Sequence, residues 1–468
     1  MLLVVHIGCL LLLAVLTACG GCRGVSTPEE DAARRDLAAV AVRYRPGDTR
    51  PRLPVLTAAS GIDEYLRYAM FRSPAVEAAY YEWAASVENI TVARSLPDPR
   101  LTFSADVART VASLVPGLMV DLPGPGKLAA AGNVAAAGSH ARYFAFEIEV
   151  LRTAFAVKTA YYRLLFLEDS LRVHGRTLQL LGEVEQLARQ QVAAGRAMLQ
   201  DVLRAQIDQE QIRARIDNLE DSRTAMVAEF KAALGIGVDE PDPPVPAQFV
   251  ASREAPSGAR ILDIAFQRNP RLRRLAAEVR QAQAMLDLAR KAGVPDISAG
   301  IEVDLKAAST IWTPSVGITL PIWRDRIAAG IAAAQAGKRA AEARLSGEQI
   351  GLAAELAATL YTYRESVRNI ELIEARLLPR ARQTLEIARA GYAIGNATFL
   401  DVVAGYRQLL DLELALIEAR TRRELALASL SLLIAGADPH GSPTLFDIGR
   451  SRQPPSAEQP DWPVRGAP

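Results

Sequence analysis

The chain has 468 residues, of which 50% are hydrophobic but only 6% are aromatic. Lysine and arginine (54 residues) balance aspartate and glutamate (53 residues), so the chain lacks the basic excess that marks a nucleic-acid-binding protein. Cysteines at positions 9, 19 and 22 only, and four scattered histidines, exclude a disulfide framework, a cysteine or histidine metal site and a Ser-His-Asp triad in the body of the chain. We therefore expect that the protein is not an enzyme and that it binds neither a cofactor nor a metal ion.

The first eighteen residues form an apolar run that is short for a membrane-spanning helix and ends in Leu16-Thr17-Ala18-Cys19. This segment resembles the signal peptide and lipobox of bacterial lipoproteins, although lysine and arginine are missing before its apolar part. The resemblance implies that residues 1–18 are removed and that Cys19 becomes an N-terminus acylated with fatty acids such as palmitate. Gly20 after the cysteine resembles lipoproteins that are sorted to the outer membrane. An uncleaved anchor or an incorrectly assigned start is the alternative.

Residues 19–59 are rich in proline, arginine and acidic residues without clear periodicity, which predicts an extended linker from the lipid to the body of the protein. From Gly61 to Leu96 apolar residues recur at helical spacing, and Pro97 ends that helix. The period then changes to two, which predicts two strands at about 99–122. Long helices follow at about 127–234, with a turn at Gly195 between them.

The second half of the chain repeats the first half about 200 residues later. The repeat predicts two domains, 60–240 and 260–435, the second with strands at about 296–320 and helices at about 324–434. Residues 436–468 form a proline-rich tail. The matching landmarks are Ser73-Pro74 with Asn269-Pro270, Leu96-Pro97-Asp98 with Val294-Pro295-Asp296, Leu122-Pro123 with Leu320-Pro321, and Gly195, Asp201 and Val202 with Gly395, Asp401 and Val402.

The alternation of apolar and charged residues in these strands suits transmembrane strands, but it also suits a half-buried soluble hairpin. The length of the helices favours the interpretation as transmembrane strands. Helices over 127–192 and 324–393 would each be roughly 100 Å long, which is more than a compact globular domain accommodates. Gly175 and Pro379 are the predicted breaks in them. Four strands cannot close a barrel, and open strand edges are not tolerated in a membrane, so other subunits must complete it.

One segment near the end of the second repeat carries a family resemblance. Residues Leu385 to Gly395, followed by Thr398-Phe399-Leu400-Asp401-Val402-Val403, are similar in residue type and spacing to the second periplasmic hairpin of the TolC-like outer-membrane efflux proteins. The helix entry at Leu320-Pro321-Ile322-Trp323 is also similar, and the chain resembles this family over about residues 60–435. Leu377-Leu378-Pro379 and Gly126-Lys127 resemble the branch of the family that serves heavy-metal efflux pumps.

The resemblance implies a mainly helical fold with membrane strands, in which three chains form one twelve-stranded β-barrel that continues as a helical tunnel in the periplasm. The protein would be a passive, lipid-anchored conduit of the outer membrane, supplied by a periplasmic adaptor and an inner-membrane pump of the RND type. Neither the exported substrate nor the energy source of the pump follows from the sequence. The alternatives are a lipid-anchored periplasmic adaptor, against which the duplicated hairpin argues, and a structural coiled-coil lipoprotein, against which the strand pairs argue.

The resemblance also implies site residues. Glu386 falls where the family places an acidic residue at the closed periplasmic end of the tunnel, and three carboxylates around one axis would repel one another and attract cations. The alternative is a solvated glutamate paired with Arg389 one turn on. The residues of the helical turns are candidates for adaptor docking, although their glycines can equally be left-handed helix caps. These turn residues are Gly195, Arg196, Gly395 and Asn396, and the candidates for acidic residues in the barrel lumen are Asp106, Glu302 and Asp304.

Overall fold

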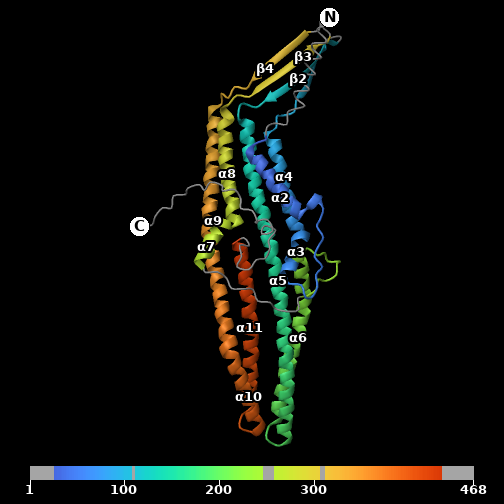
Figure 1. Ribbon diagram of the computed structural model, residues 1–468, viewed down its shortest axis with the longest axis vertical. Helices are drawn as coiled ribbons and strands as arrows, with labels where there is room; N and C mark the ends of the chain where they lie inside the picture. Colours follow the sequence, from blue (N-terminus) through green and yellow to red (C-terminus); the bar gives the residue numbers. More distant parts are fainter. Residues whose placement is uncertain (1–25, 108–110, 246–257, 306–310, 435–468) are drawn as a thin grey trace, which may run out of the picture. The chain divides into compact units, whose positions relative to one another are not determined.

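The computed structural model describes residues 26–107, 111–245, 258–305 and 311–434 (Figure 1). Two strand pairs are each followed by a long helical hairpin, which is the duplicated order that the sequence predicts. The first half contains α2 (Pro28–Tyr44), α3 (Ile62–Arg72), α4 (Pro74–Arg94), β1 (Arg100–Val107), β2 (Val111–Leu122), α5 (Lys127–Ala193) and α6 (Leu199–Leu234). The second half contains α7 (Gly258–Arg268), α8 (Pro270–Arg290), β3 (Ile297–Asp304), β4 (Ile311–Ile318), α9 (Arg324–Leu372), the π-helix η3 (Ile373–Leu377), α10 (Leu378–Ile394) and α11 (Phe399–Leu433).

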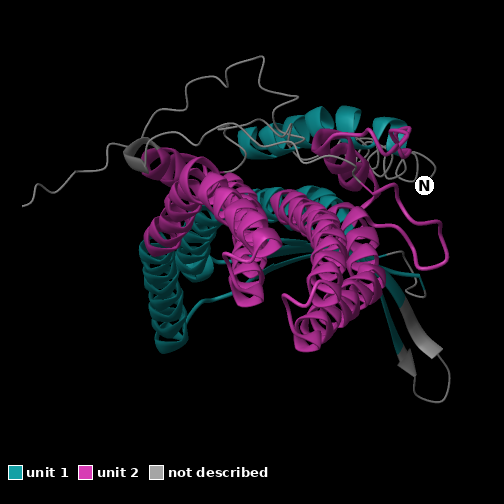
Figure 2. Ribbon diagram, turned by 90° about the horizontal axis from the view of Figure 1, so that it is seen from below, with its two compact units in different colours: residues 1–48, 78–148, 270–351 teal, residues 49–77, 149–269, 352–468 magenta. Residues whose placement is uncertain are grey.

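The chain divides into two compact units, coloured separately in Figure 2. Unit 1 comprises residues 1–48, 78–148 and 270–351, and it contains the sheet. Unit 2 comprises residues 49–77, 149–269 and 352–468, and it contains the turns of both helical hairpins. None of the described helices has the length and the hydropathy that crossing a bilayer requires.

The sheet of unit 1 is antiparallel, with the strand order β1-β2-β3-β4. Its register separates apolar from polar residues, because successive residues of a strand point to opposite faces. One row across the four strands consists of Leu101, Leu118, Ile301 and Pro314, and the next row consists of Thr102, Gly117, Glu302 and Thr313. The apolar side chains are exposed, among them Leu101 (65%), Phe103 (69%), Val316 (74%) and Ile318 (59%). An apolar sheet face that is open to its surroundings is the pattern of strands that contact lipid.

The prediction of an extended linker over residues 19–59 is wrong for residues 28–44, which form α2. The Thr27 side chain caps this helix by accepting a hydrogen bond from the Glu30 N–H at 3.2 Å, and Pro28 occupies the first turn. Glu29, Glu30 and Asp31 face the positive end of the helix dipole. The same proline and acidic residues that indicate a linker by composition are therefore the start signals of a helix.

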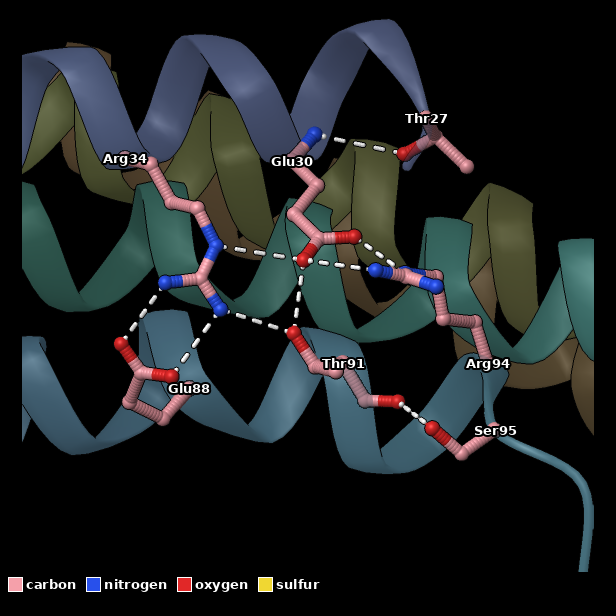
Figure 3. Close-up of polar contacts among 7 residues, drawn as sticks. All are labelled: Thr27, Glu30, Arg34, Glu88, Thr91, Arg94 and Ser95. Atoms are coloured by element: carbon pink, nitrogen blue, oxygen red, sulfur yellow. Dashed lines mark hydrogen bonds and ion pairs between the residues drawn. The ribbon is translucent and has the colours of Figure 1, made fainter. Parts of the chain in front are cut away.

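A buried carboxylate attaches α2 to α4 (Figure 3). The Glu30 side chain is 1% exposed and forms an ion pair with Arg94, and its Oε1 also accepts hydrogen bonds from Thr91 Oγ1 at 2.6 Å and from Arg34 Nε at 3.2 Å. The Arg94 guanidinium, with the hydroxyl of Thr91 and the guanidinium of Arg34, lowers the pKa of Glu30 to about 2. A second ion pair joins Arg34 to Glu88 on the outside of the cluster, at 2.8 Å between Nη1 and Oε1.

Aromatic side chains make the adjacent core of unit 1. Tyr44 at the end of α2 contacts Tyr80 of α4 and Phe146 of α5, with ring centroids 5.1 and 5.9 Å apart. Trp83 stacks on Phe146 at 5.8 Å between centroids. Because Tyr44, Trp83 and Phe146 are at most 1% exposed, α2 is an integral part of unit 1.

The two predicted helix breaks have different outcomes. The prediction at Gly175 is wrong: α5 continues through it, since a single helical glycine costs only about 1 kcal/mol. Pro379 does coincide with an interruption, because η3 ends directly before α10, which begins at Leu378. Proline lacks the N–H for the i−4 carbonyl and clashes with it, and a π-turn before it accommodates the mismatch.

Candidate functional site

The candidate site consists of the two helical turns of unit 2, between α5 and α6 and between α10 and α11. Both glycines are left-handed, with φ of 68° at Gly195 and 84° at Gly395. The N–H after each glycine bonds back to a helix carbonyl, from Arg196 to Gln191 at 2.8 Å and from Asn396 to Gly391 at 2.8 Å. These bonds define Schellman caps, which glycine adopts without steric cost. Each glycine is thus a helix cap, whether or not a partner also binds there.

The second turn is fixed more firmly than the first. Thr398 and Asp401 form a capping box, in which Asp401 Oδ2 accepts from the Thr398 N–H at 2.8 Å and from its hydroxyl at 2.7 Å. These bonds lower the pKa of Asp401. At the corresponding position of the first turn stands Met198, which makes no side-chain cap. Asp201 is therefore left to contact the other hairpin.

A hydrophobic cluster joins the two hairpins within unit 2, where their turns lie side by side (Figure 1). It takes residues from all four helices of the hairpins. Its members are Leu181, Val184, Ala188, Val202, Ala205, Leu385, Ala388, Tyr392, Phe399, Val402, Val403 and Tyr406. Gly405 lets α11 approach α10 closely, because a Cβ there would lie 3.2 Å from the Leu385 Cα. The duplicated halves thus share one core at this end.

Polar contacts between residues about 200 positions apart supplement this core. Gln191 Nε2 donates to the Ala393 carbonyl at 2.9 Å, and the Tyr392 hydroxyl lies 3.5 Å from Asp201 Oδ2. Burial, and the nearby Asp201, raise the pKa of Tyr392 to about 12, so that its hydroxyl stays protonated near neutral pH. One step further along, buried Asp208 accepts a hydrogen bond from the Tyr406 hydroxyl and one from Arg407 Nη2, the latter at 2.8 Å.

Two roles were predicted for Glu386, a carboxylate at the periplasmic constriction or a solvated partner of Arg389. Arg389 Nη2 contacts Glu183 Oε2 of α5 at 2.7 Å, whereas its Nη1 is 3.6 Å from Glu386 Oε1. The Glu386 side chain is 71% exposed. An exposed ion pair of this length contributes little. Arg389 thus mainly joins α10 to the first hairpin, while the Glu386 carboxylate is accessible to solvent.

The outer surface of the turns is open. A Cβ added at Gly195 or Gly395 would meet no other atom within 4 Å. Arg196 and Asn396 are exposed. Large apolar side chains are also exposed around the turns, namely Met198 (68%), Leu199 (64%), Ile394 (66%) and Leu400 (57%). The sequence gives no signal for these exposed apolar residues, because helical spacing alone does not distinguish them from core residues. The contacts of Tyr392, Asp208 and Tyr406 between the hairpins were not predicted either, because their partners lie about 200 positions away.

The predicted lumen residues lie on the strands of unit 1. Glu302 shares the polar row with Thr102 and Gly117, and a Cβ added at Gly117 would lie 2.6 Å from Thr102 Oγ1 and 2.7 Å from Glu302 Cγ. Asp106 and Asp304 pair with Ser113 and Ile311 in the strand register. Cys19 lies outside the described residues. In the described part of the chain, no group of three or more histidine, cysteine, aspartate or glutamate side chains is placed to hold a metal ion.

The sheet with an exposed apolar face and the paired long hairpins define a class of membrane channel proteins with a helical extension. The family model described as "Outer membrane efflux protein" matches residues 66–236 and 261–436, and the chain belongs to this family. Family membership excludes the adaptor and the coiled-coil lipoprotein as alternatives. The chain is a channel component of the outer membrane in an efflux system, as the sequence predicts.

Solved structures agree with this fold. The chain is 18% identical to VceC of Vibrio cholerae, with a TM-score of 0.68 over 80% of this chain and 96% of that chain. It is 14% identical to CmeC of Campylobacter jejuni, with a TM-score of 0.69 over 82% and 88% of the two chains. It is 17% identical to MtrE of Neisseria gonorrhoeae, with a TM-score of 0.69 over 83% and 96%. The comparison with curated proteins gave no match.

Proposed function

We propose that three copies of the chain form one twelve-stranded barrel in the outer membrane, continued in the periplasm by their helices, and that this trimer is a passive conduit without catalytic activity. The observation that carries the proposal is the four-stranded sheet of unit 1, whose apolar face is exposed and whose edge strands are β1 and β4. A membrane sheet cannot keep open edges, because no water satisfies their backbone N–H and C=O groups. Further copies of the same sheet supply the missing partners.

A lipid anchor at Cys19 completes the attachment to the outer membrane. The proposal rests on Leu16-Thr17-Ala18-Cys19 in the sequence. Three acyl chains hold a protein far more firmly than one, since each buried CH₂ contributes about 0.8 kcal/mol. The barrel would retain the protein in the membrane even without them.

The turns around Gly195 and Gly395 bind the periplasmic adaptor, which connects the channel to an inner-membrane pump of the RND type. Six similar turns would form a ring in a trimer. Support comes from the open space beside both glycines and from the exposed apolar side chains Met198, Leu199, Ile394 and Leu400, which offer a docking helix hairpin close contact.

Glu386 contributes to a constriction at this end of the conduit, where three carboxylates around one axis would attract cations. Its 71% exposed side chain is compatible with that position. Asp106, Glu302 and Asp304 would give the barrel lumen a mild preference for cations. The assignment to the heavy-metal branch stays a prediction.

The proposed assembly is tested by extracting the full chain from membranes in detergent. We expect a species of three times the protomer mass that retains a β-strand signal in circular dichroism and conducts ions in planar bilayers. The variant Cys19→Ser is the control, and its trimer should be unchanged while its mass shows no acyl chains. A monomer in mild detergent that does not conduct ions would refute the proposal.

A further inference from the structure

A polar contact in unit 1 joins the end of the first strand pair to the beginning of the second. Asp296, directly before β3, accepts two hydrogen bonds through Oδ1, from the Gly124 N–H at 2.7 Å and from Lys127 Nζ at 2.7 Å. Lys127 is the first residue of α5. Gly124 approaches Pro295 so closely that a Cβ there would lie 2.3 Å from the Pro295 carbonyl oxygen. The contact therefore fixes where a long helix leaves the sheet.

The two strand pairs are related by one constant shift in sequence number. Arg100 pairs with Met119, and adding 198 to both numbers gives Ser298 and Gly317, which also pair. Leu101 with Leu118 becomes Ala299 with Val316 in the same way, and this pair is present too. The duplicated sequence has thus kept its strand register.

The same shift predicts how two copies of the chain meet. Leu118 of β2 pairs with Ile301 of β3, and the equivalent pair joins Val316 of β4 to Phe103 of β1. Within one chain β1 and β4 are opposite edges of the sheet, three strand spacings or about 14 Å apart. The equivalent pairing can form only between neighbouring copies.

We propose that Asp98 of one copy forms an ion pair with Arg324 of the next copy, as the counterpart of the contact between Asp296 and Lys127. This inference rests on the proposed assembly of several copies into one barrel. Asp98 precedes β1 as Asp296 precedes β3, in the matching triplets Leu96-Pro97-Asp98 and Val294-Pro295-Asp296. Arg324 is matched to Lys127 by its place in the helix, because Arg324 is the first residue of α9 and Lys127 is the first residue of α5.

Both side chains are available for this contact. Asp98 and Arg324 are exposed, and neither has a hydrogen-bond or ion-pair partner for its side chain among the described residues. The surface around Arg324 is open, with a hollow of about 540 Å³ lined by Ile322, Trp323, Arg324, Asp325 and Arg326.

The two contacts differ in two respects. The shift of 198 places Asp325 at the position of Lys127, so the basic residue of the contact between copies, Arg324, lies one position earlier in the chain. By sequence number Ile322 matches Gly124, but its N–H already donates to the Leu320 carbonyl at 2.9 Å. The contact between copies therefore depends on the guanidinium of Arg324, whose five donors suit a carboxylate.

Crosslinking through introduced cysteines tests this pairing in the full chain, with Cys9 and Cys22 replaced by serine. In the variant Asp98→Cys/Arg324→Cys, a short bis-maleimide should join neighbouring copies into covalent dimers and trimers. The pair Lys127→Cys/Asp296→Cys should crosslink within one chain, so that each protomer gains the mass of one reagent molecule and no covalent dimer forms. The pair Asp98→Cys/Arg339→Cys is the control for specificity, since Arg339 lies about 22 Å further along α9. We expect at least tenfold less crosslinking from it.

Charge reversal provides a second readout. Asp98→Arg should lower the fraction of trimer that survives in detergent, and the double variant Asp98→Arg/Arg324→Asp should restore it. A trimer of the unmodified chain that gives no more crosslinking at positions 98 and 324 than at 98 and 339 would overturn the pairing and leave the proposed assembly intact. A monomeric unmodified chain would refute the assembly and the pairing together.

Discussion

Replacing Glu30 by glutamine should release α2 from α4. Its carboxylate is buried at 1% exposure and contacts Arg94, Thr91 and Arg34 at once. Glutamine keeps the size of the side chain but removes the charge. Arg94, whose side chain is only 11% exposed, is then left without its buried counter-ion. Leaving a buried charge uncompensated is costly, at about 3–5 kcal/mol.

The pKa of Glu30 gives a second value for the stabilisation that its charge contributes. It falls from 4.5 to about 2 in the folded protein, which corresponds to about 3 kcal/mol in favour of the charged form. Since the folded-state pKa is lowered, this stabilisation is present above about pH 4.5 and is lost as the pH falls towards 2. Both magnitudes predict that the amide protection of α2 decreases by at least about a hundredfold in Glu30→Gln.

Hydrogen exchange of α2, followed at pH 7 and corrected for intrinsic rates, measures this effect. The matched control is Glu88→Gln, because the Arg34–Glu88 pair is 39% and 63% exposed and should contribute less than about 1 kcal/mol. The protection of α11 should change in neither variant. Equal losses of α2 protection in Glu30→Gln and Glu88→Gln would show that burial of the carboxylate is not what holds α2.

Three further predictions concern the turns, the constriction and the helix entry. Gly195→Trp/Gly395→Trp should abolish export and crosslinking to the adaptor while the amount of trimer stays unchanged. Alanine at both positions should add only a backbone cost of about 1–2 kcal/mol each. Full export activity of the tryptophan variant would mean that the adaptor binds elsewhere. Glu386→Ala should change conductance and cation block in planar bilayers, and unchanged values would make it an ordinary surface residue. Gly124→Ala should lower the free energy of unfolding by about 1–3 kcal/mol, because its Cβ would lie 2.3 Å from the Pro295 carbonyl oxygen. Gly293→Ala is the neutral control, because a Cβ at Gly293 would meet no other atom within 4 Å.

The sequence by itself determined the order of the elements. A period of two marked the strands, Pro97 ended the helix before the first strand pair, and the shift between the halves showed the duplication. Gly195 and Gly395 could be assigned to turns because a left-handed cap is a local requirement that glycine meets. Strand periodicity and helix caps depend on residues that are neighbours in the sequence, so a short segment is sufficient to predict them.

Only the tertiary structure decided which distant residues meet. The Glu183 partner of Arg389 is 206 positions away, and the Asp201 partner of Tyr392 is 191 positions away. The prediction of a linker over residues 19–59 failed for the same reason: composition does not reveal that Glu30 is buried against Arg94, 64 positions later. Burial of a charged residue depends on the partner that compensates it, and that partner is supplied by the fold.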